Sequence, residues 1–142
     1  MTGIPRPLLL LVVSAAVVVG LTSACGGGGS GSDDPRISQI GGVAELATYA
    51  YAAAGADGLY DYLAPQVTQY CSREGLAEAL QDMELPTGFR AMTGVKFDGE
   101  KGRATVVLIF GTKDEKVQWV FVQAPDGGWR IAEAPGLERC SN

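Results

Sequence analysis

Hydrophobic and polar positions follow three different patterns along this chain of 142 residues. The first is an unbroken apolar run from Leu8 to Gly20. The second, from Arg36 to Ala54, places apolar side chains at intervals of three and four residues, which predicts an amphipathic helix. After Phe89 the interval becomes two, which is typical of strands. The chain therefore divides into an apolar leader, a helical part and a β part.

Three helices are expected in the helical part. The first has its apolar stripe at Ile40, Val43, Leu46, Ala47, Ala50 and Ala54, with Tyr49 and Tyr51 flanking it. A second, short helix is expected over residues 59–63, before Pro65, and residues 67–71 favour a short strand. Ser72 is the residue type that caps a helix, so a third helix is expected to begin there and to end before Pro86.

The β part is expected to form four strands. Val95 and Phe97 alternate with charged residues, and the next strands are expected over residues 103–110, 117–122 and 129–131. Short turns separate them, which makes neighbouring strands antiparallel. The segment 113–116, rich in charge, is expected at a solvated hairpin tip. The sequence thus predicts an α+β fold in which N-terminal helices pack on one face of a curved antiparallel sheet.

The order of these elements resembles the nuclear transport factor 2-like cone fold, which is common among bacterial lipoproteins. The resemblance rests on two helices, a short strand, a third helix beginning at Ser72, and a meander that ends in the turn and strand of residues 126–131 (DGGWRI). It covers residues 36–142, and it implies that the helices and the concave sheet enclose a cavity. The alternative is a cystatin-like α+β layer.

The leader, residues 1–24, has the layout of a secretory signal peptide. One positive charge, Arg6, precedes the apolar run, and small residues follow it. The apolar run has about thirteen residues, fewer than the roughly twenty of a transmembrane helix. We therefore expect this segment to direct export.

Cys25 directly follows the small residues, and the segment resembles a bacterial lipobox. Thr22 stands where that family usually has leucine, and the leucine is one step earlier, at Leu21. The resemblance implies that Cys25 is acylated after cleavage and that residues 25–35 form a Gly/Ser tether, with a reach of about 20 Å. The expected location is the extracytoplasmic face of the cell membrane. The alternatives are a plain secretory signal and an uncleaved anchor.

Composition removes several function classes. The chain has no histidine, so histidine-based triads and histidine-ligated zinc are excluded. Its formal charge is −5, without a cluster of Lys and Arg, so we expect no nucleic-acid partner. The acid pairs Asp33-Asp34 and Asp114-Glu115 fall on segments expected to be flexible, so we expect no metal site, and no cofactor is implied.

Cys71 and Cys140 are the two cysteines that remain when Cys25 carries lipid. An even pair in a small exported domain favours a disulfide. On the chain-entropy model this bridge stabilises the fold by roughly 4 kcal/mol. It would also tie the C-terminal tail to the segment before the third helix. The alternative is two separate thiols.

The tyrosines raise the question of catalysis, because some members of the resembled fold use a Tyr and Asp pair in the cavity for isomerase or hydrolase chemistry. Asp57 lies in a glycine-rich turn, where a carboxylate is solvated. Asp61, beside Tyr62, is the remaining candidate for a general base, which would need burial to raise its pKa. We expect no catalysis.

Aromatic side chains are the candidates for an apolar pocket, with packing in the core as the alternative. They are Tyr49, Tyr62, Phe97, Trp119, Phe121 and Trp129. We therefore expect a non-catalytic, lipid-anchored envelope protein whose domain binds a partner protein or a small apolar ligand. The alternatives are a small cavity enzyme of isomerase or hydrolase type and an accessory subunit of an envelope lipid-transport system.

Overall fold

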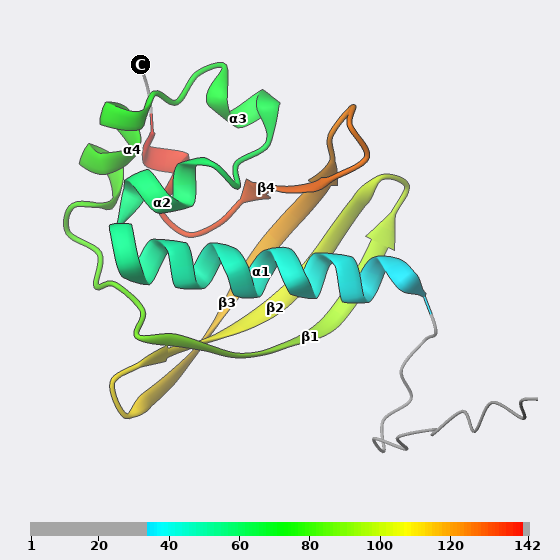
Figure 1. The fold of residues 1–142 in the computed structure, drawn as a ribbon, viewed down its shortest axis with the longest axis horizontal. Coiled ribbons are helices and arrows are strands. Elements are labelled where there is room, and N and C mark those ends of the chain that lie inside the picture. Colours follow the sequence, from blue (N-terminus) through cyan, green and yellow to red (C-terminus); the bar gives the residue numbers. More distant parts are fainter. Residues whose placement is uncertain (1–33, 141–142) are drawn as a thin grey trace, which may run out of the picture. The chain divides into compact units, whose positions relative to one another are not determined.

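The computed structural model describes residues 34–140, in which the helices precede the sheet (Figure 1). The predicted fold class, helices packed on an antiparallel sheet, is confirmed. The elements are α1 (Pro35–Ala54), α2 (Ala56–Tyr60), α3 (Pro65–Thr68), α4 (Arg73–Leu80), β1 (Gly88–Asp98), β2 (Lys101–Phe110), β3 (Lys113–Gln123), β4 (Trp129–Glu133) and the 3-10 helix η1 (Leu137–Arg139).

The strands form a meander in the order β1-β2-β3-β4, and each neighbouring pair is antiparallel. On the face that meets the helices, small residues of β2 lie beside large residues of β3. Gly102 pairs with Phe121, and Ala104 pairs with Trp119. Two irregularities in the pairing of β1 with β2 add local twist to this edge strand. The small side chains leave room for a helix to approach the sheet.

Helix α1 lies across this face of the sheet, while α2, α4 and η1 gather near the C-terminal end of α1 (Figure 1). Gly102 marks the closest approach, because a Cβ atom there would lie 2.6 Å from Cδ1 of Ile40. A larger residue at position 102 would therefore force the Ile40 side chain to shift. The arrangement is consistent with a cone-type α+β fold.

The start of α1 is fixed by local chemistry. Asp34 is the N-cap and accepts a hydrogen bond from the backbone N–H of Arg36 at 3.0 Å, while Pro35 occupies the first turn. The Arg36 guanidinium also pairs with the Asp34 carboxylate at 2.6 Å and lies 3.8 Å from the ring centroid of Phe97. These contacts attach the first turn of α1 to β1.

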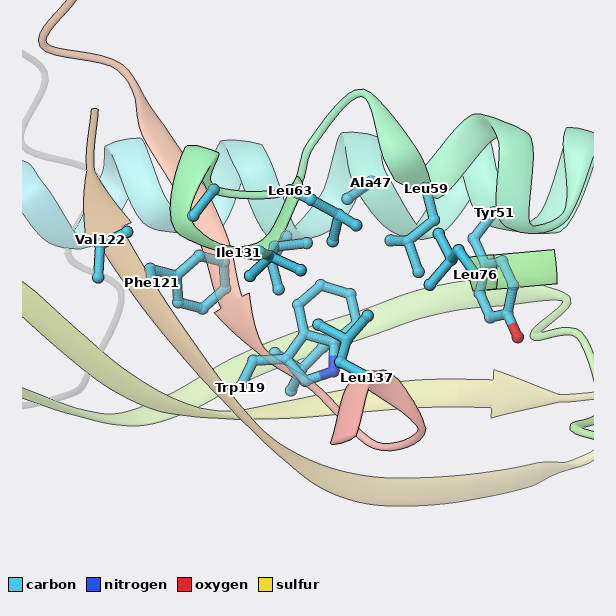
Figure 2. Packing of buried hydrophobic residues seen from close by; sticks show 14 of the residues in the cluster. Ala47, Tyr51, Leu59, Leu63, Leu76, Trp119, Phe121, Val122, Ile131 and Leu137 are labelled. Atoms are coloured by element: carbon cyan, nitrogen blue, oxygen red, sulfur yellow. The ribbon is translucent and has the colours of Figure 1, made fainter. Parts of the chain in front are cut away.

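The buried face of α1 differs from the predicted stripe. Its buried residues are Ile40, Ala44, Ala47, Thr48 and Tyr51. Leu46 was expected inside, but its side chain is 58% exposed, whereas Tyr51, expected at the flank, is buried (Figure 2). The predicted stripe included positions on the side of α1 that faces solvent. The packing of α1 on the sheet and on α2 decides which side is buried.

Two further expectations are wrong. Residues 67–71 form no strand: Pro65–Thr68 is a helical turn with proline at its first position, and Leu63 forms the parallel bridge to Ile131 instead. The charged segment 113–116 belongs to β3 rather than to a hairpin tip. Its side chains are exposed, but its backbone pairs with residues 107–110 of β2, so polarity alone gave no sign of the strand.

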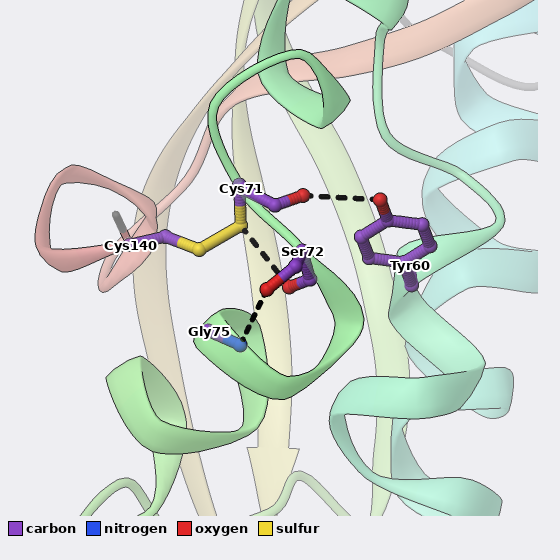
Figure 3. The surroundings of a disulfide bond; sticks show 5 residues. All are labelled: Tyr60, Cys71, Ser72, Gly75 and Cys140. Atoms are coloured by element: carbon purple, nitrogen blue, oxygen red, sulfur yellow. Dashed lines mark hydrogen bonds between the residues drawn. A yellow bond between two sulfur atoms is a disulfide. The ribbon is translucent and has the colours of Figure 1, made fainter. Parts of the chain in front are cut away.

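The predicted disulfide between Cys71 and Cys140 is confirmed (Figure 3). The two Cα atoms are 5.4 Å apart across a separation of 69 residues. Next to the bridge, the Ser72 hydroxyl accepts the backbone N–H of Gly75 at 3.0 Å, as expected for the N-cap of α4. The bridge therefore joins the end of η1 to the start of α4.

Cys25 and the predicted signal peptide lie outside the described residues. Of the expected tether, Asp34 and Pro35 are described, and they already belong to the start of α1. Within residues 34–140, no helix combines the length and the apolar character needed to cross a bilayer.

Candidate ligand pocket

A pocket of about 100 Å³ lies between the helices and the inner face of the sheet. Its walls come from α1, α2, α4 and the following turn, β2, β3 and the tail after β4. The lining residues are Tyr51, Leu59, Leu80, Met83, Glu84, Leu108, Phe110, Glu115, Val117, Trp119, Ala134 and Pro135. We call this space the Tyr51 pocket.

The strands supply one wall by simple alternation. Leu108 and Phe110 are two residues apart on β2, and Val117 and Trp119 are two residues apart on β3, so each pair points to the same face. Leu80 of α4 closes the opposite side. Alternate strand residues face the helices, so this wall is apolar up to Glu115, which shares the face of Val117 and is exposed.

The tail after β4 closes another side, with Ala134 and Pro135. Its position depends on two attachments further along the chain. Leu137 is buried in the core, and Cys140 forms the disulfide to Cys71. The bridge therefore also fixes a wall of the pocket.

The charged residues of the pocket are Glu84 and Glu115, and both are exposed. The buried polar group is the hydroxyl of Tyr51, whose residue is 7% exposed. Within residues 34–140, it is the one buried side-chain oxygen or nitrogen without a hydrogen-bond partner. Burial raises the pKa of the Tyr51 hydroxyl above 10.0, and the charge of Arg139 partly offsets this. The hydroxyl is therefore neutral at physiological pH.

The predicted pocket aromatics separate into three groups. Trp119 lines the Tyr51 pocket. Phe121 and Trp129 are buried in the core instead, and Phe97 packs 6.0 Å from Trp129 with Arg36 over its ring. Phe97, Phe121 and Trp129 therefore take part in core packing, which was the alternative to a place in the pocket wall.

The other two candidates come from the helical part of the chain, and neither lines the Tyr51 pocket. Tyr49 is 49% exposed on α1. Tyr62 is half-buried against the core, and its backbone carbonyl accepts the N–H of Ile131 at 2.8 Å. Tyr49 therefore shares α1 with Tyr51, whereas Tyr62 follows α2, and both lie outside the Tyr51 pocket.

Asp61, the candidate general base, is exposed and forms an ion pair with Arg73. The same guanidinium pairs with Asp57 at 2.6 Å and lies 4.6 Å from the ring centroid of Tyr60. Neither Asp61 nor Tyr62 lines the Tyr51 pocket. This charge cluster links α2 to α4 at the surface.

Sequence reasoning missed most of the pocket residues, Tyr51 above all. The signal that could have found it is the spacing of Ile40, Ala44, Ala47 and Tyr51, which follows intervals of four, three and four residues. The more hydrophobic Leu46 drew the predicted stripe to a neighbouring side of the helix.

A second hollow, of about 400 Å³, is lined by residues of β4 and its tail, Tyr70 and Gln118. Tyr70, Gln118, Glu133 and Glu138 are exposed, so this is an open depression. Within residues 34–140, no group of three or more His, Cys, Asp or Glu side chains could hold a metal ion. The Tyr51 pocket is therefore the better candidate for a ligand site.

No family model, curated protein or solved structure matches this chain. Its likeness to the nuclear transport factor 2-like cone rests on the order of the helices and the four-stranded meander within residues 34–140.

Proposed function

We propose that this chain is a lipid-anchored, non-catalytic protein of the cell envelope whose domain binds a small apolar ligand in the Tyr51 pocket. One observation carries the proposal: an apolar pocket, open between the helices and the inner face of the sheet, with its two carboxylates exposed. Concave sites with mainly apolar walls and few polar groups are typical of small-molecule binding.

The size of the pocket limits the ligand. Sites for drug-sized molecules measure roughly 300–1,000 Å³, whereas a dry apolar cavity of roughly 150 Å³ holds benzene. A pocket of about 100 Å³ with an open side suits a single ring or a short branched chain. A longer ligand would leave its remainder outside, near Glu84 and Glu115.

The positions of the acids support binding without catalysis. A carboxylate that acts as a general base near neutral pH is normally buried or placed beside a like charge. Asp57 and Asp61 are instead exposed and paired with Arg73. Glu84 and Glu115 are exposed as well.

The lipid anchor is proposed from the sequence around Cys25. A chain with a formal charge of −5 is repelled by anionic headgroups, so its own surface is poorly suited to hold it on a membrane. An acyl anchor on Cys25 would provide this attachment.

Two measurements test the binding function. Native mass spectrometry of the protein purified from its own membranes should find a retained small molecule, and a retained partner protein would favour the other binding role. Titration of the full-length protein with toluene, followed by methyl NMR, should shift Leu80, Leu108 and Val117 but leave the exposed Leu46 unchanged. Val117→Phe, which fills the pocket, should abolish the shifts of Leu80 and Leu108. Equal shifts at Leu46 and Leu108 would contradict a pocket.

A further inference from the structure

We propose that Tyr51 selects the ligand: the pocket takes a compact apolar group that carries one uncharged oxygen, hydrogen-bonded to the Tyr51 hydroxyl. This inference rests on the proposed function and specifies its ligand class. It starts from the unpartnered hydroxyl, which is buried and belongs to a residue of the pocket wall.

Two other hydroxyls of the helical part, one on a buried and one on a half-buried residue, have partners. The Thr48 hydroxyl, three residues earlier on α1, donates to the carbonyl of Ala44 at 2.7 Å. The Tyr60 hydroxyl donates to the carbonyl of Cys71 at 3.0 Å. A buried polar group without a partner destabilises a fold, and phenylalanine at position 51 would fill the same space without this cost. A ligand that supplies a hydrogen-bond partner for the Tyr51 hydroxyl would remove this cost.

Figure 2 shows how Tyr51 is placed. Its ring lies at one end of the labelled core side chains, near Leu76, and its hydroxyl points away from Leu59. The ring therefore completes the core while the oxygen lies at the edge of the packed cluster. The oxygen atom itself is covered, so a group that enters the pocket from its open side reaches it when the side chains that cover it shift.

The surrounding charges favour an uncharged oxygen. Glu84 and Glu115 lie on the pocket and repel an anionic group, and one neutral hydroxyl cannot replace the hydration of a carboxylate. Arg139 is exposed and does not line the pocket, so it provides no direct partner there. A buried ammonium would face the same loss of hydration. A hydroxyl, ether or carbonyl oxygen meets the tyrosine hydroxyl without this loss.

The test compares phenol with toluene, two single rings that differ by a hydroxyl in place of a methyl group. Affinities of both for the full-length protein are measured from the methyl shifts of Leu80, Leu108 and Val117. In Tyr51→Phe the ratio of phenol to toluene affinity should fall about tenfold, because one buried hydrogen bond is lost. Tyr49→Phe, which removes an exposed hydroxyl from the same helix, should leave the ratio unchanged.

Wild-type protein supplies a second measurement that does not depend on the folding of Tyr51→Phe. Anisole carries an ether oxygen where ethylbenzene carries a methylene, so anisole should bind more tightly. Benzoate should bind more weakly than phenol.

The outcomes separate the two proposals. If toluene binds but Tyr51→Phe leaves the ratio unchanged and anisole gains nothing, the selection by Tyr51 is wrong, while the binding function stands. Tighter binding of benzoate would overturn the uncharged class. If no ring binds the wild type, the proposed function fails together with this inference.

Discussion

The indole N–H of Trp129 donates to the side-chain oxygen of Gln39 at 3.0 Å and so joins β4 to α1 across 90 residues of sequence. Trp129 is 3% exposed, whereas Gln39 is exposed. The Trp129 ring also packs on Phe97, which lies beneath Arg36. This cluster holds the N-terminal half of α1 on the sheet, while Tyr51, near the other end of the helix, faces the pocket.

Replacement of Gln39 by alanine should destabilise the protein by about 1 kcal/mol, because the buried indole N–H then depends on water for its hydrogen bond. Chemical denaturation monitored by tryptophan fluorescence measures the effect. Gln66→Ala, at an exposed position in α3, is the control and should change the free energy of unfolding by less than about 0.5 kcal/mol. Equal losses in the two variants would contradict a specific role for Gln39.

Loss of the disulfide should weaken both the fold and the pocket. Cys140→Ser should lower the free energy of unfolding by roughly 2–4 kcal/mol, because the unfolded chain regains the entropy of an open loop. Toluene binding should also weaken, because Pro135 is no longer held by the bridge. Thermal melting and the methyl shifts measure the two effects. Thiol titration of wild type that finds Cys71 and Cys140 reactive would refute the premise.

Two glycine replacements should act in opposite directions. A Cβ atom on Gly58 would overlap the backbone carbonyl of Ala50, where α2 packs on α1, so Gly58→Ala should destabilise the fold by about 1–3 kcal/mol. Gly42 is exposed on α1 and has no atom near its Cβ position. Gly42→Ala should therefore stabilise by about 0.5–1 kcal/mol. Denaturation midpoints of both variants, measured side by side, check the pair.

The N-cap of α1 should make stability depend on acid pH. Hydrogen bonds from Arg36 lower the pKa of Asp34 below its ordinary value of 3.8. Because the folded pKa is the lower one, the contribution is present above the unfolded value and is lost as the pH falls through the folded one. An NMR titration of the Asp34 carboxyl should find the lowered pKa. In Arg36→Gln that pKa should rise, and an unchanged value would remove Arg36 as the cause.

The lipid anchor predicts a defined change in mass. Intact-mass analysis of the mature wild-type protein should find residues 25–142 with acyl chains on Cys25. Cys25→Ala should leave the precursor uncleaved and free of acyl chains, because the acylated thiol is what the processing step requires. A wild-type protein without lipid on Cys25 would show that the segment is a plain secretory signal or an uncleaved anchor.

The sequence alone predicted the elements that depend on local chemistry. Ser72 caps α4 through a bond to the helix's own backbone, so the cap does not depend on how α4 packs. Strands joined by short turns form an antiparallel meander, which can be predicted before the core is known. The pairing of Cys71 with Cys140 followed from cysteine number and the expected compartment. Residues 67–71 show the limit: they suggested a short strand, whereas Val67 and Thr68 belong to a helical turn that begins at Pro65.

Only the tertiary structure decided which side of α1 is buried and where the pocket lies. Leu46 and Tyr51 are both apolar enough to face a core, and the packing of α1 on the sheet and on α2 exposes one and buries the other. Whether the Tyr51 hydroxyl finds a partner depends on atoms from elements distant in sequence. Local patterns set the helices and strands, because their hydrogen bonds are local, whereas the pocket is the space left when those elements pack.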